Sequence, residues 1–337
     1  MRTRAIYGCS GVEMTPEERA FFRESQPWGF ILFARNVRDP EQVRALVSTL
    51  RDCVGDARAP VLIDQEGGRV ARLKPPHWKT RPPARAFGDL YRRNPDAGRK
   101  ATYLNARAMA DELAQLGIDV DCVPVLDVPV AGANDVIGDR ALASDPEIVA
   151  SLGRVVIDAM LDGGVLPVIK HVPGHGRANA DSHLALPRVS TSVDELRRTD
   201  FAPFRALHDC PLAMTAHVVY EAPDPDNPAT TSAKIIRDII RGDIGFDGLL
   251  MSDDLSMNAL DGTLAERAGA ALAAGCDMLL HCNGRMDQME AVAGEATALE
   301  GEASRRADAA LAQRHAPKAF DAAAADVRVA ELLEAMA

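Results

Sequence analysis

Three short runs decide the fold class of this chain: FILF (residues 30–33), PVLID (60–64) and GLLM (248–251). Each run is nearly continuous in apolar side chains, which is typical of a parallel strand that is covered on both faces. Similar runs recur along the chain, and longer segments with helical spacing separate them. The candidate strands are residues 5–8, 29–33, 59–64, 121–127, 165–171, 212–217, 248–253 and 277–281.

The segments between these runs carry helix signals. Thr15 and Pro16 open one helix, and Asp39 and Pro40 open another, because each pair combines an N-cap residue with a first-turn proline. Apolar spacing predicts a helix over residues 96–116 that stops at Gly117. Further helices are expected at residues 193–207, 232–241, 264–274 and 286–299, and the Ala-rich tail from about 303 to 337 is expected to form one or two closing helices.

This alternation predicts an α/β fold, and within that class a single (β/α)₈ barrel of the TIM type. An open doubly wound sheet is disfavoured because no Gly-rich phosphate turn follows the first strand. The chain shows no internal repeat and no stretch of linker composition. We therefore expect residues 1–337 to form one domain.

Composition restricts the partners and the compartment. The net charge of −11 argues against nucleic acid or an anionic membrane surface as a partner. The sequence offers neither a signal peptide nor an apolar stretch long enough for a transmembrane helix. Six scattered cysteines without CxxC spacing fit reduced thiols better than disulfides or a zinc site. We expect a cytoplasmic protein, and a monomer.

Ionisable residues gather at the carboxyl ends of the predicted strands, where the active site of such a barrel lies. A purely structural barrel has little reason for this pattern, so the sequence predicts a site at the barrel mouth. The polar residues at these ends are Asp64, Asp127, Lys170, His171, His217, Asp253 and Asp254.

Each candidate also has a structural interpretation. Neighbouring residues point in opposite directions at a strand end, so we expect only one of Asp253 and Asp254 to face the cavity; both could instead cap the following helix. Lys170 suits sugar hydroxyls, or an ion pair with a carboxylate of a neighbouring strand. In the loop over residues 174–183, Asp181 can fix the tautomer of His183 and make it a general acid–base, although a surface turn is also possible. No HxH or HExxH pattern is present, so no metal is expected.

At these residues the sequence resembles glycoside hydrolase family 3, and specifically its short bacterial branch of β-N-acetylglucosaminidases that act in peptidoglycan recycling. The combination of several motifs in one order makes the resemblance specific. The matching segments are GFILFARN (29–36), LIDQEGGRVARL (62–73), VPVLDV (123–128), VIGDRAL (136–142), IKHVPGHG (169–176), ADSH (180–183), MTAHVVY (214–220) and GFDGLLMSDDLSM (245–257).

The resemblance implies a retaining hydrolase that removes terminal N-acetylglucosamine from muropeptides without a cofactor. Asp253 would be the nucleophile, and His183 would be the acid–base, held by Asp181. The positions that would hold the sugar are Asp64, Arg72, Arg140, Lys170 and His171.

The chain departs from the commonest family pattern within the loop. Arg177 and Ala178 stand where many members have Asp-Thr, and Val172 replaces a frequent Phe. These changes bear on loop mobility and leaving-group preference. Three alternatives stay open at this point: a glycoside phosphorylase, a β-glucosidase, and a sugar-binding barrel without catalysis.

Overall fold

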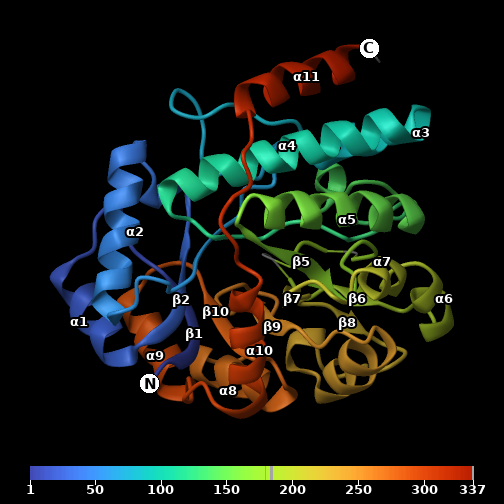
Figure 1. The fold of residues 1–337 in the computed structure, drawn as a ribbon. Helices are drawn as coiled ribbons and strands as arrows, with labels where there is room; N and C mark the ends of the chain where they lie inside the picture. Colours follow the sequence, from blue (N-terminus) through green and yellow to red (C-terminus); the bar gives the residue numbers. More distant parts are fainter. Residues whose placement is uncertain (179, 183–184, 336–337) are drawn as a thin grey trace.

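Eight parallel strands close into a barrel in the order β1-β10-β9-β7-β5-β4-β3-β2, with helices around it (Figure 1). The computed structural model describes residues 1–178, 180–182 and 185–335. The predicted (β/α)₈ class is confirmed, and every predicted strand overlaps a strand of the barrel. The strands are β1 (Thr3–Gly8), β2 (Pro27–Leu32), β3 (Val61–Ile63), β4 (Val120–Asp121), β5 (Leu166–Val172), β7 (Leu212–Thr215), β9 (Leu249–Asp254) and β10 (Met278–His281).

Both faces of these strands are buried, which explains their continuous apolar runs. Along β1, Ile6 packs inside the barrel, whereas its neighbours Ala5 and Tyr7 belong to the outer layer between the barrel and the helices. Along β2, Ile31 lies inside and Phe30 lies outside. Two apolar layers therefore form, one filling the barrel and one joining it to the helices.

Two predicted helix boundaries agree with the capping observed, whereas the helix expected over residues 286–299 ends at Glu295. Thr15 Oγ1 accepts from the Glu18 N–H at 3.1 Å, and Gly117 ends a helix with φ of 79°. None of the helices within the described ranges is long and apolar enough to cross a membrane. The helices around the barrel are α1 (Pro16–Ser25), α2 (Pro40–Val54), α3 (Ala84–Arg93), α4 (Pro95–Leu116), α5 (Pro146–Asp162), α6 (Val193–Arg198), α7 (Phe201–Ala206), α8 (Leu264–Ala274) and α9 (Met286–Glu295).

The helices α3 and α5 were not predicted, and several other segments differ from the prediction. The helix expected over residues 193–207 is interrupted between α6 and α7, where the buried Asp200 accepts from Thr199 and Arg177. The helix expected over 232–241 is a π-helix, η4 (Ile235–Asp243). Two short strands, β6 (Arg188–Val189) and β8 (Val219–Tyr220), pair outside the barrel and were not predicted.

The fourth strand is much shorter than predicted. The ladder covers only β4, and beyond it Val125 forms an isolated bridge with Lys170. Pro124 lies between them and has no N–H to donate, so the ladder is interrupted there. The prediction of a strand over residues 121–127 is therefore wrong in extent, although the chain still carries Asp127 to the barrel mouth.

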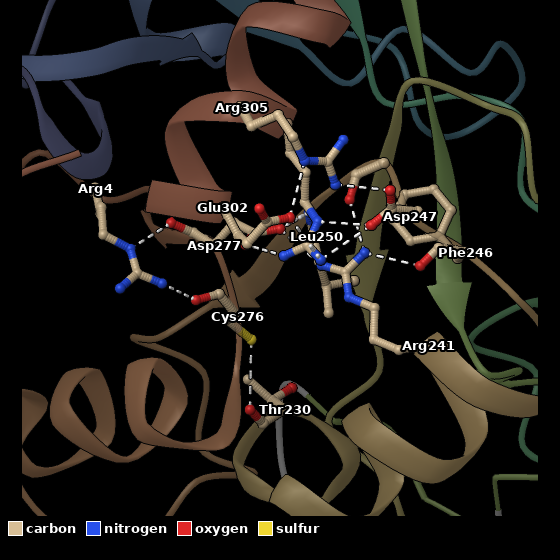
Figure 2. Close-up of polar contacts among 12 residues, drawn as sticks. Arg4, Thr230, Arg241, Phe246, Asp247, Leu250, Cys276, Asp277, Glu302 and Arg305 are labelled. Atoms are coloured by element: carbon tan, nitrogen blue, oxygen red, sulfur yellow. Dashed lines mark hydrogen bonds and ion pairs between the residues drawn. The ribbon is translucent and has the colours of Figure 1, made fainter. Parts of the chain in front are cut away.

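The amino end of the barrel is closed by α10 (Gly301–Ala312), whose Ala307 and Ala310 join the apolar cluster inside the barrel. Figure 2 shows an ion network beside this helix, in which Asp277 Oδ2 pairs with Arg241 at 2.7 Å. The last helix, α11 (Ala322–Glu334), lies along α4 (Figure 1), so the tail does form two helices as predicted. Because α10 covers this end, access to the barrel is from the carboxyl end of the strands.

Candidate active site

The carboxyl ends of the strands surround a cavity of about 260 Å³. Six of the eight predicted site residues line it: Asp64, Arg72, Arg140, Lys170, His171 and Asp253. Asp181 is half-buried and precedes the cavity-lining Ser182, but it does not line the cavity itself. His183 lies outside the described residues. The other polar lining residues are Glu66, His175, Ser182 and Asp254.

Lys170 is the centre of an ionic cluster on the cavity wall. Its Nζ lies 2.8 Å from Asp64 Oδ1 and 2.7 Å from Glu66 Oε1, and its side chain is 2% exposed. Burial disfavours the charged lysine, but the two carboxylates outweigh burial and raise the pKa of Lys170 above its ordinary value. The expected pairing with a neighbouring strand's carboxylate is therefore present, in a residue that also lines the cavity.

Two arginines complete this cluster. Arg72 pairs with Asp64 Oδ2 at 3.1 Å. The Arg140 guanidinium donates two hydrogen bonds to the Glu66 carboxylate, at 2.8 and 2.9 Å. Burial works against ionisation of Asp64, but Lys170 and Arg72 hold its pKa well below the usual range. Three cations thus face two carboxylates, which leaves a net positive charge on the wall. Arg72 Nε–H is buried and has no acceptor among the described residues.

A tight turn after β3 brings Arg72 back to Asp64. Gly67 has φ of 91°, and a Cβ there would lie 2.5 Å from the Pro82 carbonyl oxygen, so only glycine fits. The Gln65 side chain then accepts from the Arg72 N–H at 2.8 Å. Sequence reasoning omitted Glu66 from the site. Its spacing of two residues from Asp64 could have identified it, since alternate residues of an extended chain lie on the same face.

Asp127 fixes the first residues of the loop that follows β5. Its Oδ2 lies 2.7 Å from His171 Nδ1, and its Oδ1 accepts from the backbone N–H groups of His171 and His175 at 3.1 and 2.6 Å. Burial opposes ionisation, but the two histidines lower the pKa of Asp127 to about 2. An ionised carboxylate there keeps a proton on Nδ1 and leaves Nε2 of His171 for the cavity.

His175 joins the two ends of the same loop. Its Nε2 lies 3.2 Å from Ser182 Oγ, and its side chain is buried against the cavity. Burial and the charge of His171 lower the pKa of His175 to about 4. This histidine is therefore neutral at pH 7, and the loop is held by hydrogen bonds that do not require its charge.

The low pKa of His175 predicts a stability that falls on acidification. The unfolded chain takes up a proton near pH 6.5, whereas folded His175 does so only near pH 4, so the contribution is complete above pH 6.5 and is lost as the pH falls. We expect a loss on the order of 3 kcal/mol from this residue between pH 7 and pH 4. Denaturant unfolding of wild type and His175→Gln at both values measures it. An identical pH dependence in the two proteins would exclude this origin.

Asp253 and Asp254 both contribute to the lining of the cavity. Hydrogen bonding distinguishes them. Asp254 Oδ1 accepts from the backbone N–H groups of Ser256 and Cys282, each at 3.1 Å, and its Oδ2 accepts from Ser256 Oγ at 2.7 Å. Asp253 Oδ1 accepts from the Asp254 N–H at 2.8 Å, and no described residue bonds its Oδ2.

The surroundings of Asp253 favour its charged form. Burial disfavours ionisation, but the nearby His217 and His171 outweigh it and lower the pKa of Asp253. His217 itself is engaged at both ring nitrogens, at 2.7 Å from Thr230 Oγ1 and 3.0 Å from the Asp254 carbonyl oxygen. Asp253 thus presents an ionised oxygen to the cavity, whereas His217 is a support for the strand ends.

Arg177, one of the departures in the loop, points away from the cavity. Its Nε donates to Asp200 Oδ2 at 2.7 Å, and its guanidinium lies 3.0 Å from Glu195. These contacts fasten the loop to α6 and the start of α7.

Over the described ranges, no group of three or more His, Cys, Asp and Glu side chains is arranged to hold a metal ion.

Comparison with known proteins gives one consistent result. Residues 7–314 match the model of the glycosyl hydrolase family 3 N-terminal domain. A β-hexosaminidase of Alkalilimnicola ehrlichii is 43% identical over 285 residues, which cover 82% of this chain and 80% of the relative. The crystal structure of native NagZ from Neisseria gonorrhoeae is similar with a TM-score of 0.88 at 32% identity, over 98% of both chains.

A second structure of the Neisseria protein, in complex with N-trifluoroacetyl-D-glucosamine, is similar with a TM-score of 0.87 at 31% identity, over 99% of this chain and 97% of that one. Sequence, family model and fold therefore agree over most of the chain. The chain belongs to glycoside hydrolase family 3 and is a β-hexosaminidase of that family.

Proposed function

We propose that this enzyme is a retaining, exo-acting β-N-acetylglucosaminidase that removes the terminal non-reducing N-acetylglucosamine from peptidoglycan-derived muropeptides. The observation that carries the proposal is an ionised Asp253 whose Oδ2 no described residue bonds, in a small cavity that the Lys170 cluster also lines. The complex of the Neisseria relative with an N-acylated glucosamine analogue supports the choice of sugar. A cavity of about 260 Å³ is small for a ligand site, which favours one sugar unit over a continuous chain.

The cluster around Lys170 is proposed to hold the sugar. Asp64 accepts from hydroxyl groups, and Lys170 and Arg72 donate to them, including the buried Arg72 Nε–H. Arg140 and the Nε2 of His171 are the remaining contacts. The charges are fixed by their ion pairs before the substrate arrives, so bonds to hydroxyls that strengthen as the ring becomes oxocarbenium-like favour the transition state.

The reaction is a double displacement. Asp253 attacks the anomeric carbon as the glycosidic C–O bond breaks, and His183 gives its proton to the departing oxygen. Water then attacks the glycosyl ester, His183 takes the proton of that water, and Asp253 leaves as a carboxylate. Asp181 is proposed to orient His183 and to stabilise its charged form. No step requires a metal or an organic cofactor.

Paired aryl substrates test this function. We expect release of N-acetylglucosamine from the 4-nitrophenyl β-N-acetylglucosaminide, with little turnover of the matching β-glucoside. The rate should be the same in phosphate and phosphate-free buffer, with no sugar 1-phosphate. A preference for the glucoside would make the enzyme a β-glucosidase, and phosphate-dependent formation of a sugar 1-phosphate would make it a phosphorylase.

The muropeptide assignment needs a natural fragment. We expect N-acetylglucosamine to be released from its disaccharide with 1,6-anhydro-N-acetylmuramic acid, and the β-anomer to appear first by proton NMR. Initial formation of the α-anomer would contradict retention.

The cytoplasm is the proposed compartment. This proposal fits the six cysteines, which are all buried free thiols in the structure.

Asp127→Asn tests how His171 is oriented. Asparagine preserves the shape, but its amide N–H₂ can face Nδ1 and move the ring proton to Nε2. We expect kcat/KM for the aryl substrate to fall about 10²-fold, with a changed pH profile. Asp127→Glu is the control that keeps the charge. A normal pH profile in Asp127→Asn would show that this carboxylate acts only in folding.

A further inference from the structure

Residues 33–36 form a rigid part of the cavity rim. Phe33 follows β2, is half-buried and lines the cavity. The buried Asn36 fixes this segment, because its Oδ1 accepts from the Phe33 N–H at 2.9 Å and its Nδ2 donates to the carbonyl oxygens of Cys9 and Gly11 at 3.0 and 2.8 Å. The backbone of Phe33 is therefore held in place against the segment that follows β1.

Arg35 is exposed on this rim and yet is held in place. Its Nε donates to the Cys9 carbonyl oxygen at 2.9 Å, and its Nη2 donates to the carbonyl oxygen of Cys282, a residue that lines the cavity. Its guanidinium carbon lies 5.0 Å from the centre of the Phe33 ring. The remaining N–H groups have no acceptor among the described residues, and the side chain has little freedom left to lose on binding.

The charge of Arg35 is not neutralised by the protein. No carboxylate of the described residues lies within ion-pair distance of it, in contrast to the cations Lys170, Arg72 and Arg140 of the cavity wall. Arg69 also bonds residues of the rim, but Asp139 lies 3.2 Å from its Nε. A positive charge is thus presented beside Cys282 and Phe33, in a protein whose net charge is −11.

We propose that Phe33 and Arg35 form the aglycone subsite, and that Arg35 makes the enzyme prefer aglycones that carry a carboxylate. This inference rests on the proposed function, which places the terminal sugar against the Lys170 cluster. The leaving group then points toward the cavity mouth. The Arg35 guanidinium provides a bidentate partner for an acid group on a second sugar ring. The Phe33 ring lies beside this guanidinium and also contacts the Arg72 guanidinium carbon at 5.0 Å.

A matched pair of disaccharides tests the inference. One is the N-acetylglucosaminyl 1,6-anhydro-N-acetylmuramic acid with its lactyl carboxylate free, and the other is its methyl ester. We expect the kcat/KM of wild type to be about three- to fivefold higher for the acid than for the ester, because a partly exposed ion pair contributes only a small free energy. The preference should shrink in 0.5 M NaCl.

Arg35→Gln should bring the ratio between acid and ester to about one, while turnover of the neutral 4-nitrophenyl substrate stays within twofold of wild type. Arg35→Lys should restore part of the preference because it keeps the charge. Arg38→Gln is the control, since Arg38 is an exposed arginine that lies three residues further along the chain and pairs with Asp39 at 3.0 Å. This control should keep the wild-type ratio.

The possible outcomes separate the two proposals. A wild-type enzyme that cleaves the aryl substrate but neither disaccharide would overturn the muropeptide function, and this inference with it. A wild-type ratio of one, or an unchanged ratio in Arg35→Gln, would overturn the inference alone. An equal loss by Arg35→Gln on all three substrates would assign Arg35 to folding and would also overturn it.

Discussion

Asp253→Asn is expected to lower kcat for the 4-nitrophenyl β-N-acetylglucosaminide by about four orders of magnitude or more. The amide cannot form the glycosyl ester, so the step that breaks the glycosidic bond loses its nucleophile. The fold should be preserved, because the Asp254 N–H is the one donor to Asp253 Oδ1 among the described residues and an amide oxygen can accept from it equally well. Steady-state hydrolysis, with circular dichroism to confirm folding, measures both effects.

Asp254→Asn is the matched control, one residue further along the chain. The carboxylate of Asp254 accepts three hydrogen bonds from Ser256 and Cys282, so this substitution should lower the free energy of unfolding. We expect it to reduce kcat by less than about tenfold. A larger kcat loss in Asp254→Asn than in Asp253→Asn would exchange the roles assigned to the two carboxylates.

His183→Ala is expected to have an effect that depends on the leaving group. Without the acid, an alkoxide such as a sugar must depart unprotonated, so kcat/KM for the disaccharide should fall about 10²- to 10⁴-fold. A dinitrophenolate leaves without a proton, so the aryl glycoside with this group should lose much less. A plot of rate against leaving-group pKa should be steeper for the variant than for wild type.

His208→Ala provides the control, because His208 is an exposed histidine whose Nδ1 lies 2.9 Å from the Arg205 carbonyl oxygen. It should leave the slope unchanged. Equal loss for His183→Ala across all leaving groups would argue against an acid role. The assignment of His183 as the acid would then be withdrawn.

The fold was readily predicted because barrel strands are buried on both faces and leave continuous apolar runs. Prediction was less successful where tertiary contacts override the local pattern. The buried Asp200 interrupts the helical spacing of residues 193–207 through its bonds to Thr199 and Arg177. At residues 121–127 an apolar run continues past the end of the ladder, since Pro124 has no N–H to donate.

The site was predicted from the residues at the strand ends. Such residues show which side chains lie near the barrel mouth, but they do not show which of these side chains bond to one another. Asp64 and Lys170 were found because each lies at or next to the carboxyl end of a predicted strand. Glu66 was missed because its role depends on the turn at Gly67, which directs the chain back over the cavity. Asp127 was noted only as a strand-end residue. Its three hydrogen bonds to His171 and His175 arise from residues that are 44 and 48 positions away, a relationship that no local pattern reveals.

Trapping the glycosyl-enzyme tests the central claim most directly. A 5-fluoro-N-acetylglucosaminyl fluoride keeps the 2-acetamido group, slows both steps and has a good leaving group, so the covalent ester should accumulate. After peptic digestion and tandem mass spectrometry, we expect the sugar on Asp253, within the peptide that spans LLMSDDL (249–255). A label on Asp254, or active enzyme that turns over the fluoride without any covalent adduct, would contradict the assignment of Asp253 as the nucleophile.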